Sequence, residues 1–461
     1  MEPTFPFEGM LLFGGVSVLL LVGLILRAKV KFLQRFFVPA CLIAGIIGFI
    51  ARELLEYTGT IEASSGMLES FAYHLFNITF ISLGLTGRPD APRNIKQRLE
   101  GFKGITKMGL LIGTVAALQF TLGGALTMLF NVLGFNLFPT FGFLLPLGFE
   151  EGPGQALSIG KTWESSFGFT NGASIGLTFA TFGFLFAIFV GVPLVSWGIR
   201  KGLAAHHDSS KIGSELRTGI YCKGSTPVTS GRLTTHSSSL DTLTMHAALI
   251  GFVYLISYGL IRVLSMVVPT DIGEMLWGFF FVFGLLVSFL IRALIERLGG
   301  AYVLDNQTQS RLTGLGVDLL IVTSISAISL QVIHDYLAPL LIMAISAGTV
   351  TLLWILYFGK RLWKNYHFER TVGLYGMETG TVATGLVLIR LADPDFRTPA
   401  ATDLAISSII ALFPLLAMFL LMNAPLLMGW SLGLTTLVFA AFIPILLILL
   451  KVFGLLHSPR Q

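Results

Sequence analysis

The chain reads GFEEG at residues 148–152 and GMETG at residues 376–380, and these two stretches decide its fold. Both follow the pattern G-x-E-x-G, and the second begins 228 residues after the first, at position 376 against 148. Each lies in an apolar stretch that glycine or proline interrupts, residues 137–161 and 372–392. Interrupted backbone at membrane depth is tolerated only where protein or a water-filled cavity covers it. The pair of motifs therefore predicts a site inside a membrane protein.

The composition is that of a protein dissolved in lipid. Hydrophobic residues make up 54% and charged residues 12% of the 461 residues, and the mean hydropathy is +0.80. A soluble domain carries about 25% charged residues. We therefore predict an all-α integral membrane protein that uses the lipid bilayer as its solvent. The net charge of +5 does not indicate a nucleic-acid partner, because the basic residues lie in short runs between apolar segments.

Apolar runs predict about eleven transmembrane helices. A helix needs about 20 apolar residues to cross the hydrocarbon core of a bilayer. The predicted crossings are residues 10–26, 36–55, 71–85, 104–133, 169–199, 247–268, 275–290, 315–333, 337–358, 404–422 and 426–453.

The basic residues support this count. They cluster at 27–35, 88–103, 200–232, 292–311 and 360–364. Positively charged loops stay in the cytoplasm, and eleven crossings with an outside N-terminus make every cluster cytoplasmic. We therefore predict a multi-pass protein of the cell inner (plasma) membrane, with its N-terminus outside and its C-terminus in the cytoplasm.

The same count makes the two interrupted stretches re-entrant hairpins, the first entering from outside and the second from the cytoplasm. Each hairpin follows four crossings and precedes a fifth, which predicts an inverted-topology 5+5 repeat. The predicted parts are a first repeat at 1–199, a cytoplasmic linker loop at 200–244, a second repeat at 245–423, and an additional C-terminal transmembrane helix and tail at 424–461.

The hairpins carry the candidate binding chemistry. A carboxylate at the centre of a membrane helix costs at least about 2.5–3.5 kcal/mol and is a functional hypothesis by default. Flanking glycines let the backbone unwind, and hydroxyls and amides complete an oxygen-rich cage for a hard cation. The predicted cation ligands are Glu150, Gly152, Ser158, Thr379 and Gly380. The predicted substrate-binding residues are Glu151, Gly154, Gln155, Thr170, Asn171, Glu378, Thr381, Thr384 and Arg390.

These assignments leave alternatives open. One of the glutamates could simply satisfy free backbone N–H groups at a hairpin tip. Burial favours the neutral form of a carboxylate, so a proton competes with sodium as the coupling ion. Arg390 could pair with an anionic substrate or lie near a membrane interface.

The stretch after the first hairpin resembles the bacterial sodium/glutamate symporter family. The resemblance is carried by GFTN at 168–171, ATFG at 180–183 and the following Pro193, with recognisable motifs over 71–193 and 314–423. The first loop differs, since the family shows serine, glycine and histidine where this chain has EEGPGQ at 150–155. Glu378 stands where the family has glycine.

The resemblance implies sodium-coupled uptake of an acidic amino acid by a homodimer. It also implies an elevator-like transport domain that moves against a scaffold. Alternatives are a sodium- or proton-coupled transporter of the same fold for another substrate, and an ion channel. No nucleophile–base pair, metal motif or phosphate-binding loop is recognisable in the sequence, so an enzyme is not expected. No cofactor other than the coupling ion is expected.

Overall fold

The protein is all-helical in the residues that the structure describes. The computed structural model describes residues 7–58, 65–86, 95–205, 214–224, 229–394 and 397–455. The first half contains α1 (Glu8–Lys29), α2 (Lys31–Arg35), α3 (Ala40–Tyr57), α4 (Ser65–Leu85), α5 (Ile95–Val132), η1 (Phe141–Phe143), α6 (Leu144–Phe149), α7 (Pro153–Phe167), α8 (Gly172–Phe189), α9 (Gly191–Arg200) and α10 (Ser214–Thr218). The second half contains α11 (Thr242–Val267), α12 (Thr270–Gly278), α13 (Phe280–Arg297), η3 (Gly300–Val303), α14 (Asn306–Ser326), α15 (Leu330–Asp335), α16 (Leu337–Leu362), α17 (His367–Glu378), α18 (Val382–Ala392), α19 (Ala400–Leu421), α20 (Ala424–Leu427) and α21 (Leu432–Val452).

The helices confirm a multi-pass membrane protein. Among the described residues, seven helices are long and apolar enough to cross a membrane, or eight if the bent pair α12–α13 is one span. A helix stands at each of the eleven predicted crossings. Helices α3, α4 and α14 have a similar length but are not among the seven. The count of eleven therefore stays a prediction.

Several of the predicted crossings are interrupted in the structure, and the crossing at 275–290 bends by 68° between α12 and α13. The crossing at 315–333 breaks between α14 and α15, at residues 327–329. The crossing at 426–453 begins with the end of α20 and continues as α21 only from Leu432. There Gly429 has a φ of +65°, and the Ser431 hydroxyl accepts a hydrogen bond from the Leu434 N–H at 3.1 Å. A glycine at positive φ ends a helix and a serine cap begins the next one.

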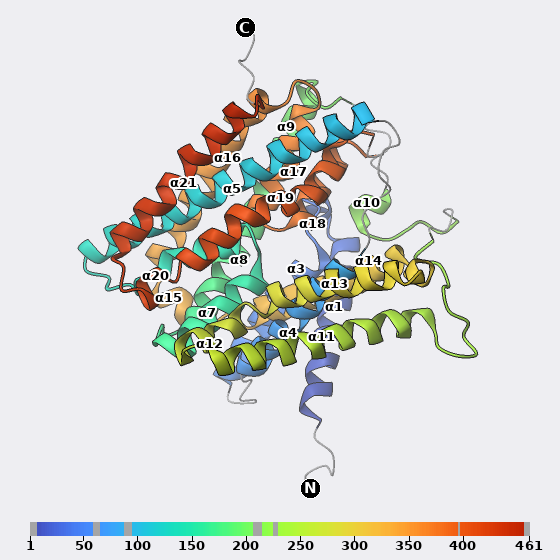
Figure 1. Ribbon diagram of the computed structural model, residues 1–461, viewed down its shortest axis with the longest axis horizontal. Coiled ribbons are helices and arrows are strands. Elements are labelled where there is room, and N and C mark those ends of the chain that lie inside the picture. The colour runs from blue at the N-terminus through green and yellow to red at the C-terminus, as the bar shows by residue number, and fades with distance from the viewer. Residues whose placement is uncertain are drawn as a thin grey trace.

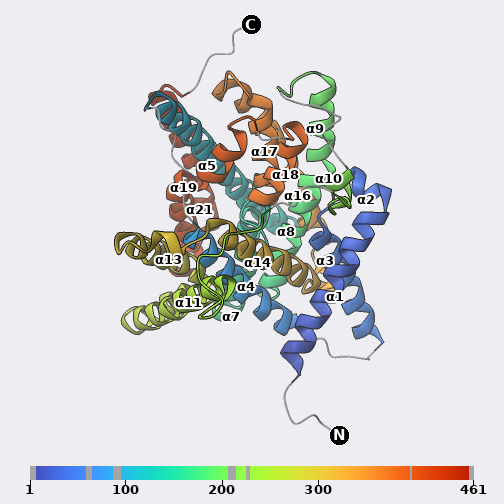
Figure 2. The ribbon, with the colours of Figure 1, turned by 90° about the vertical axis from the view of Figure 1, so that its right-hand side faces the viewer.

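The helices form two groups. The α4 group consists of α1, α3, α4, α11, α13 and α14, which pack on one another, and the α5 group consists of α5 with α16, α19 and α21 around it. Figure 1 shows α5, α19 and α21 side by side, with α11, α13 and α14 below them. Figure 2 shows α1 beside α3 at one edge of the molecule. Helix α7 packs on α8 and also contacts α4, α12 and α14, so it lies against the α4 group.

The G-x-E-x-G stretches are helix breaks. The first separates α6 from α7, with Gly152 at φ +88° and Pro153 as the first residue of α7. Proline suits this position because the first helical N–H has no partner within the helix. The second separates α17 from α18, where the Thr381 N–H at the start of α18 donates to the Thr384 hydroxyl. The Thr384 hydroxyl also donates to the Gly376 carbonyl at 2.7 Å, which fastens α18 to α17.

The linker at 200–244 is docked where the structure describes it. The Ala205 N–H donates to a Glu369 carboxylate oxygen on α17 at 2.7 Å. The Arg232 N–H donates to Asp305, the cap of α14, at 3.2 Å. The basic positions 88–94 and parts of the linker, 206–213 and 225–228, lie outside the described residues.

Candidate functional site

The two helix breaks meet in space. A Cβ added at Gly152 would lie 3.1 Å from Thr381 Cγ2 and 3.6 Å from the Gly380 carbonyl oxygen. Helix α8 passes both breaks, since a Cβ added at Gly183 would lie 2.6 Å from the Thr379 carbonyl oxygen and 3.3 Å from Phe149 Cα. Glycine at both places allows this close backbone approach. Motifs that are 228 residues apart in the chain thus form one place in the fold.

Three carboxylates gather at this meeting point. Glu150 is 4% exposed and Glu378 is fully buried, whereas Glu151 is half-buried. Glu150 lies within electrostatic range of both Glu378 and Glu151, and Glu378 lies within range of Glu151. Within the described chain, no ion pair joins any of the three to a basic side chain. Like charges this close and this buried repel one another unless a cation or a proton neutralises them.

Several buried acceptors at the meeting point lack donors. Among the described residues, both carboxylate oxygens of Glu378 and Oε1 of Glu150 have no hydrogen-bond partner. Gln155 donates through Nε2 to Glu151 Oε2 at 2.8 Å, while its own Oε1 finds no donor in the described part of the chain. A buried acceptor without a donor costs about 1–3 kcal/mol. The place therefore suits a ligand that brings positive charge or N–H groups.

The threonines of the second break have different surroundings. The Thr379 hydroxyl donates to the Tyr375 carbonyl at 2.7 Å, as a back-bonded helix threonine does. The Thr384 hydroxyl receives the Thr381 N–H at 2.8 Å. The hydroxyl of Thr381 has no partner among the described residues, so it is available to a ligand.

The sequence did not single out one side chain at this place, Gln119 of α5. Its Nε2 donates to the Glu378 carbonyl oxygen at 3.1 Å and to the Thr351 hydroxyl of α16 at 3.0 Å. Gln119 is buried, and its Oε1 has no donor within the described ranges. A lone glutamine inside the apolar run 104–133 is itself a signal of a polar contact at membrane depth.

The structure brings most of the predicted residues together but separates others. Those at or beside the meeting point are Glu150, Glu151, Gly152, Gln155, Glu378, Thr379, Gly380, Thr381 and Thr384. Gly154 adjoins Gln155 but faces the Phe76 ring, and the four that lie farther away are Ser158, Thr170, Asn171 and Arg390.

Each separated residue has its own environment. Gly154 packs against the Phe76 ring, where an added Cβ would lie 2.0 Å from Cδ2. The Ser158 hydroxyl donates to the Gly278 carbonyl at 2.7 Å, at the bend between α12 and α13. Arg390 is exposed near the end of α18. Thr170 and Asn171 follow the end of α7, which at about 1.5 Å per residue over 15 residues is about 22 Å from the break.

Asn171 instead lines a polar cavity of about 730 Å³ at one end of the helices. The cavity lies between the ends of α3, α7 and α14 and the starts of α4, α8 and α15. Its charged lining residues are Arg52, Glu53, Glu56, Glu69, Lys161 and Glu164. Lys161 Nζ is 2.9 Å from Glu69 Oε2 on α4 and 2.9 Å from Glu164 Oε1, so an ion pair joins α7 to the α4 group across this cavity.

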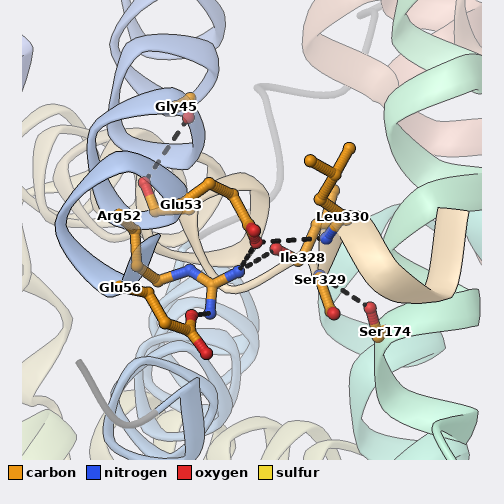
Figure 3. Close-up of polar contacts among 9 residues, drawn as sticks. Gly45, Arg52, Glu53, Glu56, Ser174, Ile328, Ser329 and Leu330 are labelled. Carbon is orange, nitrogen blue, oxygen red and sulfur yellow. Dashed lines mark hydrogen bonds and ion pairs between the residues drawn. The ribbon is translucent and has the colours of Figure 1, made fainter. Parts of the chain in front are cut away.

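Figure 3 shows the polar contacts that hold the turn between α14 and α15 beside the cavity. The Arg52 guanidinium contacts the Ile328 carbonyl oxygen and the Glu53 carboxylate. Glu53 Oε1 also accepts the Leu330 N–H at 3.1 Å. From the other side, Ser174 of α8 accepts the Ser329 N–H at 3.0 Å. The turn therefore connects α3 with α8.

In the described residues, no group of three or more His, Cys, Asp or Glu side chains is arranged to hold a metal ion. A cation at the meeting point would rest largely on carbonyl, amide and hydroxyl oxygens, which suit a hard alkali or alkaline-earth ion.

Comparison with known proteins identifies one family. The sequence profile described as sodium/glutamate symporter matches residues 11–389, which include both helix breaks and the polar cavity. No curated protein matches the chain.

Proposed function

Because this chain belongs to the sodium/glutamate symporter family, we propose that it is a secondary active transporter that couples the entry of sodium to the uptake of glutamate or a related small carboxylate. The family is one of membrane transporters rather than enzymes, and sodium is its coupling ion. The substrate, the residues that bind it and the transport motion are the proposed part.

The observation that carries the proposal is the meeting of two helix breaks around buried carboxylates. Secondary transporters built from inverted repeats bind substrate and ions where discontinuous helices meet near the midplane. Here Gly152 of one break approaches Thr381 of the other, with Glu150 and Glu378 buried between the same elements. The side-chain oxygens of Glu150, Glu378 and Thr381 that have no partner in the described chain are available to an ion or a substrate.

Residue roles follow from the placements. We assign the sodium site to Glu150, Gly152, Thr379 and Gly380, and the substrate site to Glu151, Gln155, Glu378, Thr381 and Thr384, with Gln119 added. Ser158 and Gly154 are assigned to packing of α7 against α12 and α4, since their contacts are made there. We assign Asn171, Thr170 and Arg390 to the two ends of the substrate's route across the membrane rather than to its centre.

The motion that we propose is of the elevator type. The α5 group would move together with α6–α8 and α17–α18, while the α4 group stays fixed as the scaffold and forms the interface of a homodimer. In support, the described residues show the ion pair of Lys161 with Glu69 between α7 and the α4 group, whereas Ser158 of α7 donates to Gly278 of α12. The inverted 5+5 repeat, the eleven crossings and an outside N-terminus belong to the same proposal.

A second candidate function is a transporter of the same fold with a different substrate. Three carboxylates without a basic partner in the described chain would repel an acidic substrate unless cations accompany it. This favours a cation-coupled or proton-coupled transporter for a substrate less acidic than glutamate. An ion channel is less well supported, because channels use rings of groups from several subunits.

Uptake of radiolabelled glutamate into proteoliposomes tests the proposal. Accumulation that requires an inward sodium gradient is the expected result. Accumulation driven equally by a proton gradient without sodium would favour the second candidate. Equilibration without accumulation in either gradient would contradict coupled transport altogether.

A further inference from the structure

We propose that an anionic phospholipid binds through its phosphate to a basic cluster at the predicted cytoplasmic end of α5 and α16. The basic cluster consists of Lys103 and Lys107 on α5, Lys364 in the link between α16 and α17, and Arg370 on α17. This inference goes beyond the proposed function, because it does not depend on what the protein transports.

The first observation is that these cationic side chains converge from separate parts of the chain. Arg370, Lys103 and Lys364 all lie within electrostatic range of Lys107. Lys103 and Lys364 belong to two different basic runs of the sequence, and the packing of α5 and α17 against α16 brings these runs together (Figure 1). A surface that gathers charges of one sign attracts ions of the opposite sign. The basic cluster therefore favours an anion.

Acidic neighbours neutralise only part of this charge. Arg370 forms an ion pair with Asp403 of α19, with 2.7 Å between Nη2 and Oδ2. Lys103 and Lys364 are exposed, and neither forms an ion pair with an acidic side chain in the described ranges. The positive charges of these two lysines are therefore available to a ligand.

The second observation is an unpaired donor inside the basic cluster. Trp363 is 5% exposed, and its Nε1–H has no acceptor among the described residues. The Arg370 Cζ lies 5.7 Å from the centroid of the Trp363 ring. Lys107 Nζ donates at 2.6 Å to the carbonyl oxygen of Leu362, the residue before Trp363. A phosphate oxygen would accept from the indole and pair with the cations at the same time.

Exposed aromatic side chains favour a lipid as the source of the phosphate. Phe102, next to Lys103 on α5, is 59% exposed, and Tyr357, near the end of α16, is 54% exposed. Aromatic rings are enriched at the level of the lipid headgroups. Basic pockets between membrane helices on the cytoplasmic side bind phospholipid headgroups. A phospholipid can place its phosphate at the basic cluster and its acyl chains along apolar helix faces, whereas free phosphate uses only the charges.

Thermal unfolding of the purified full chain in a non-ionic detergent tests this inference. The probes are phosphatidylglycerol, phosphatidylcholine with the same acyl chains, and glycerol phosphate. We expect phosphatidylglycerol to raise the unfolding temperature at a concentration at least about tenfold lower than either of the others. Equal shifts by the two lipids overturn the inference, because the headgroup charge would then be irrelevant. An equal shift by glycerol phosphate overturns the assignment to a lipid.

A double variant locates the binding. Lys103→Gln combined with Lys364→Gln should weaken the binding of phosphatidylglycerol by about 10- to 30-fold, because each lysine near a membrane surface contributes roughly a factor of five. The control is Lys29→Gln combined with Lys31→Gln, which removes the same charge from exposed positions in another basic run. The control should change the binding by less than about twofold. Equal weakening in both double variants overturns the inference, since it would indicate general attraction to basic residues.

The substitution Trp363→Phe tests the unpaired donor. It keeps a ring beside Arg370 and removes the Nε1–H, so we expect phosphatidylglycerol to bind about tenfold more weakly. Without lipid, the variant should unfold at the same or a higher temperature, because a buried donor without an acceptor is gone. Unchanged binding of phosphatidylglycerol overturns the assignment of this N–H to the phosphate.

The outcomes separate this inference from the proposed function. Binding of phosphatidylglycerol is measured without substrate and without a sodium gradient. Selective binding of phosphatidylglycerol by a chain that accumulates no substrate would support the lipid site and contradict coupled transport. Sodium-driven uptake by a chain that binds both lipids equally would support transport and overturn the lipid site.

Discussion

The side-chain amide of Gln119 donates a hydrogen bond to the backbone carbonyl of Glu378 over 3.1 Å. The two residues are 259 positions apart, on α5 and at the end of α17. The same amide nitrogen also binds Thr351 of α16. One buried glutamine thus holds the second helix break against the two long helices beside it, and the position of Glu378 depends on it.

Replacing Gln119 with leucine should weaken the site. The Glu378 carbonyl would lose its donor in a buried place, a change that costs about 1–3 kcal/mol. We expect substrate and sodium affinity, measured by thermal shift or uptake, to fall by about 5- to 100-fold. Gln309→Leu is the matched control, because Gln309 is equally buried but binds Ser82 within the α4 group. Equal losses of affinity in both variants would contradict a specific role for Gln119.

Replacing Gly152 with alanine should disrupt the meeting of the breaks. Gly152 has φ +88° and ψ −175°, a conformation essentially limited to glycine, and its Cβ would press on Thr381. The strain amounts to about 1–3 kcal/mol, so we expect sodium-driven uptake to fall by at least about tenfold.

Gly168→Ala is the control for this change. Gly168, at the other end of α7, also has a positive φ of +72°, but an added Cβ meets no atom of the described chain within 4 Å. It should lower the unfolding temperature with little effect on uptake. Normal uptake by the Gly152 variant would show that transport does not require the close approach of the two helix breaks.

Removing Arg52 should destabilise the protein more than removing either of its acidic partners. Arg52 is 7% exposed, and its loss leaves the Ile328 carbonyl without this donor and leaves Glu53 with the Leu330 N–H but no positive charge beside it. Breaking a buried pair in this way costs about 3–5 kcal/mol. Glu56, 60% exposed and 3.5 Å from Arg52, should contribute less than about 1 kcal/mol. The unfolding temperatures of Arg52→Ala and Glu56→Ala in detergent compare the two substitutions. A similar fall in unfolding temperature in both variants would contradict the assigned geometry.

Cysteine labelling tests the opposed entry of the two hairpins. Thr170 and Lys364 are exposed residues outside the two hairpins: Thr170 follows α7 of the first, and Lys364 precedes α17 of the second. In a chain that lacks Cys41 and Cys222, a membrane-impermeant thiol reagent should label a cysteine at 170 from outside and one at 364 only after the membrane is opened. Gly154 is unsuitable for this purpose because Phe76 fills its space. Labelling of both positions from one side would contradict the inverted repeat.

Sequence alone was enough to identify an all-helical membrane protein, its family and the places where two of its helical stretches break. These properties depend on local composition: long apolar runs require lipid, and closely spaced glycine or proline residues weaken a helix locally. The recurrence of G-x-E-x-G also marked Glu150 and Glu378 as functional candidates, because a carboxylate is costly in lipid.

Only the tertiary structure decided which of the candidate residues share one place. Thr170 and Asn171 are close to the first break in sequence, yet the length of α7 separates them from it, and Asn171 lines the polar cavity. Gln119 is far from both breaks in sequence, yet helix packing brings its amide to the carbonyl of Glu378. Contacts between helices depend on how whole surfaces fit together, and a local pattern of residues does not contain that information.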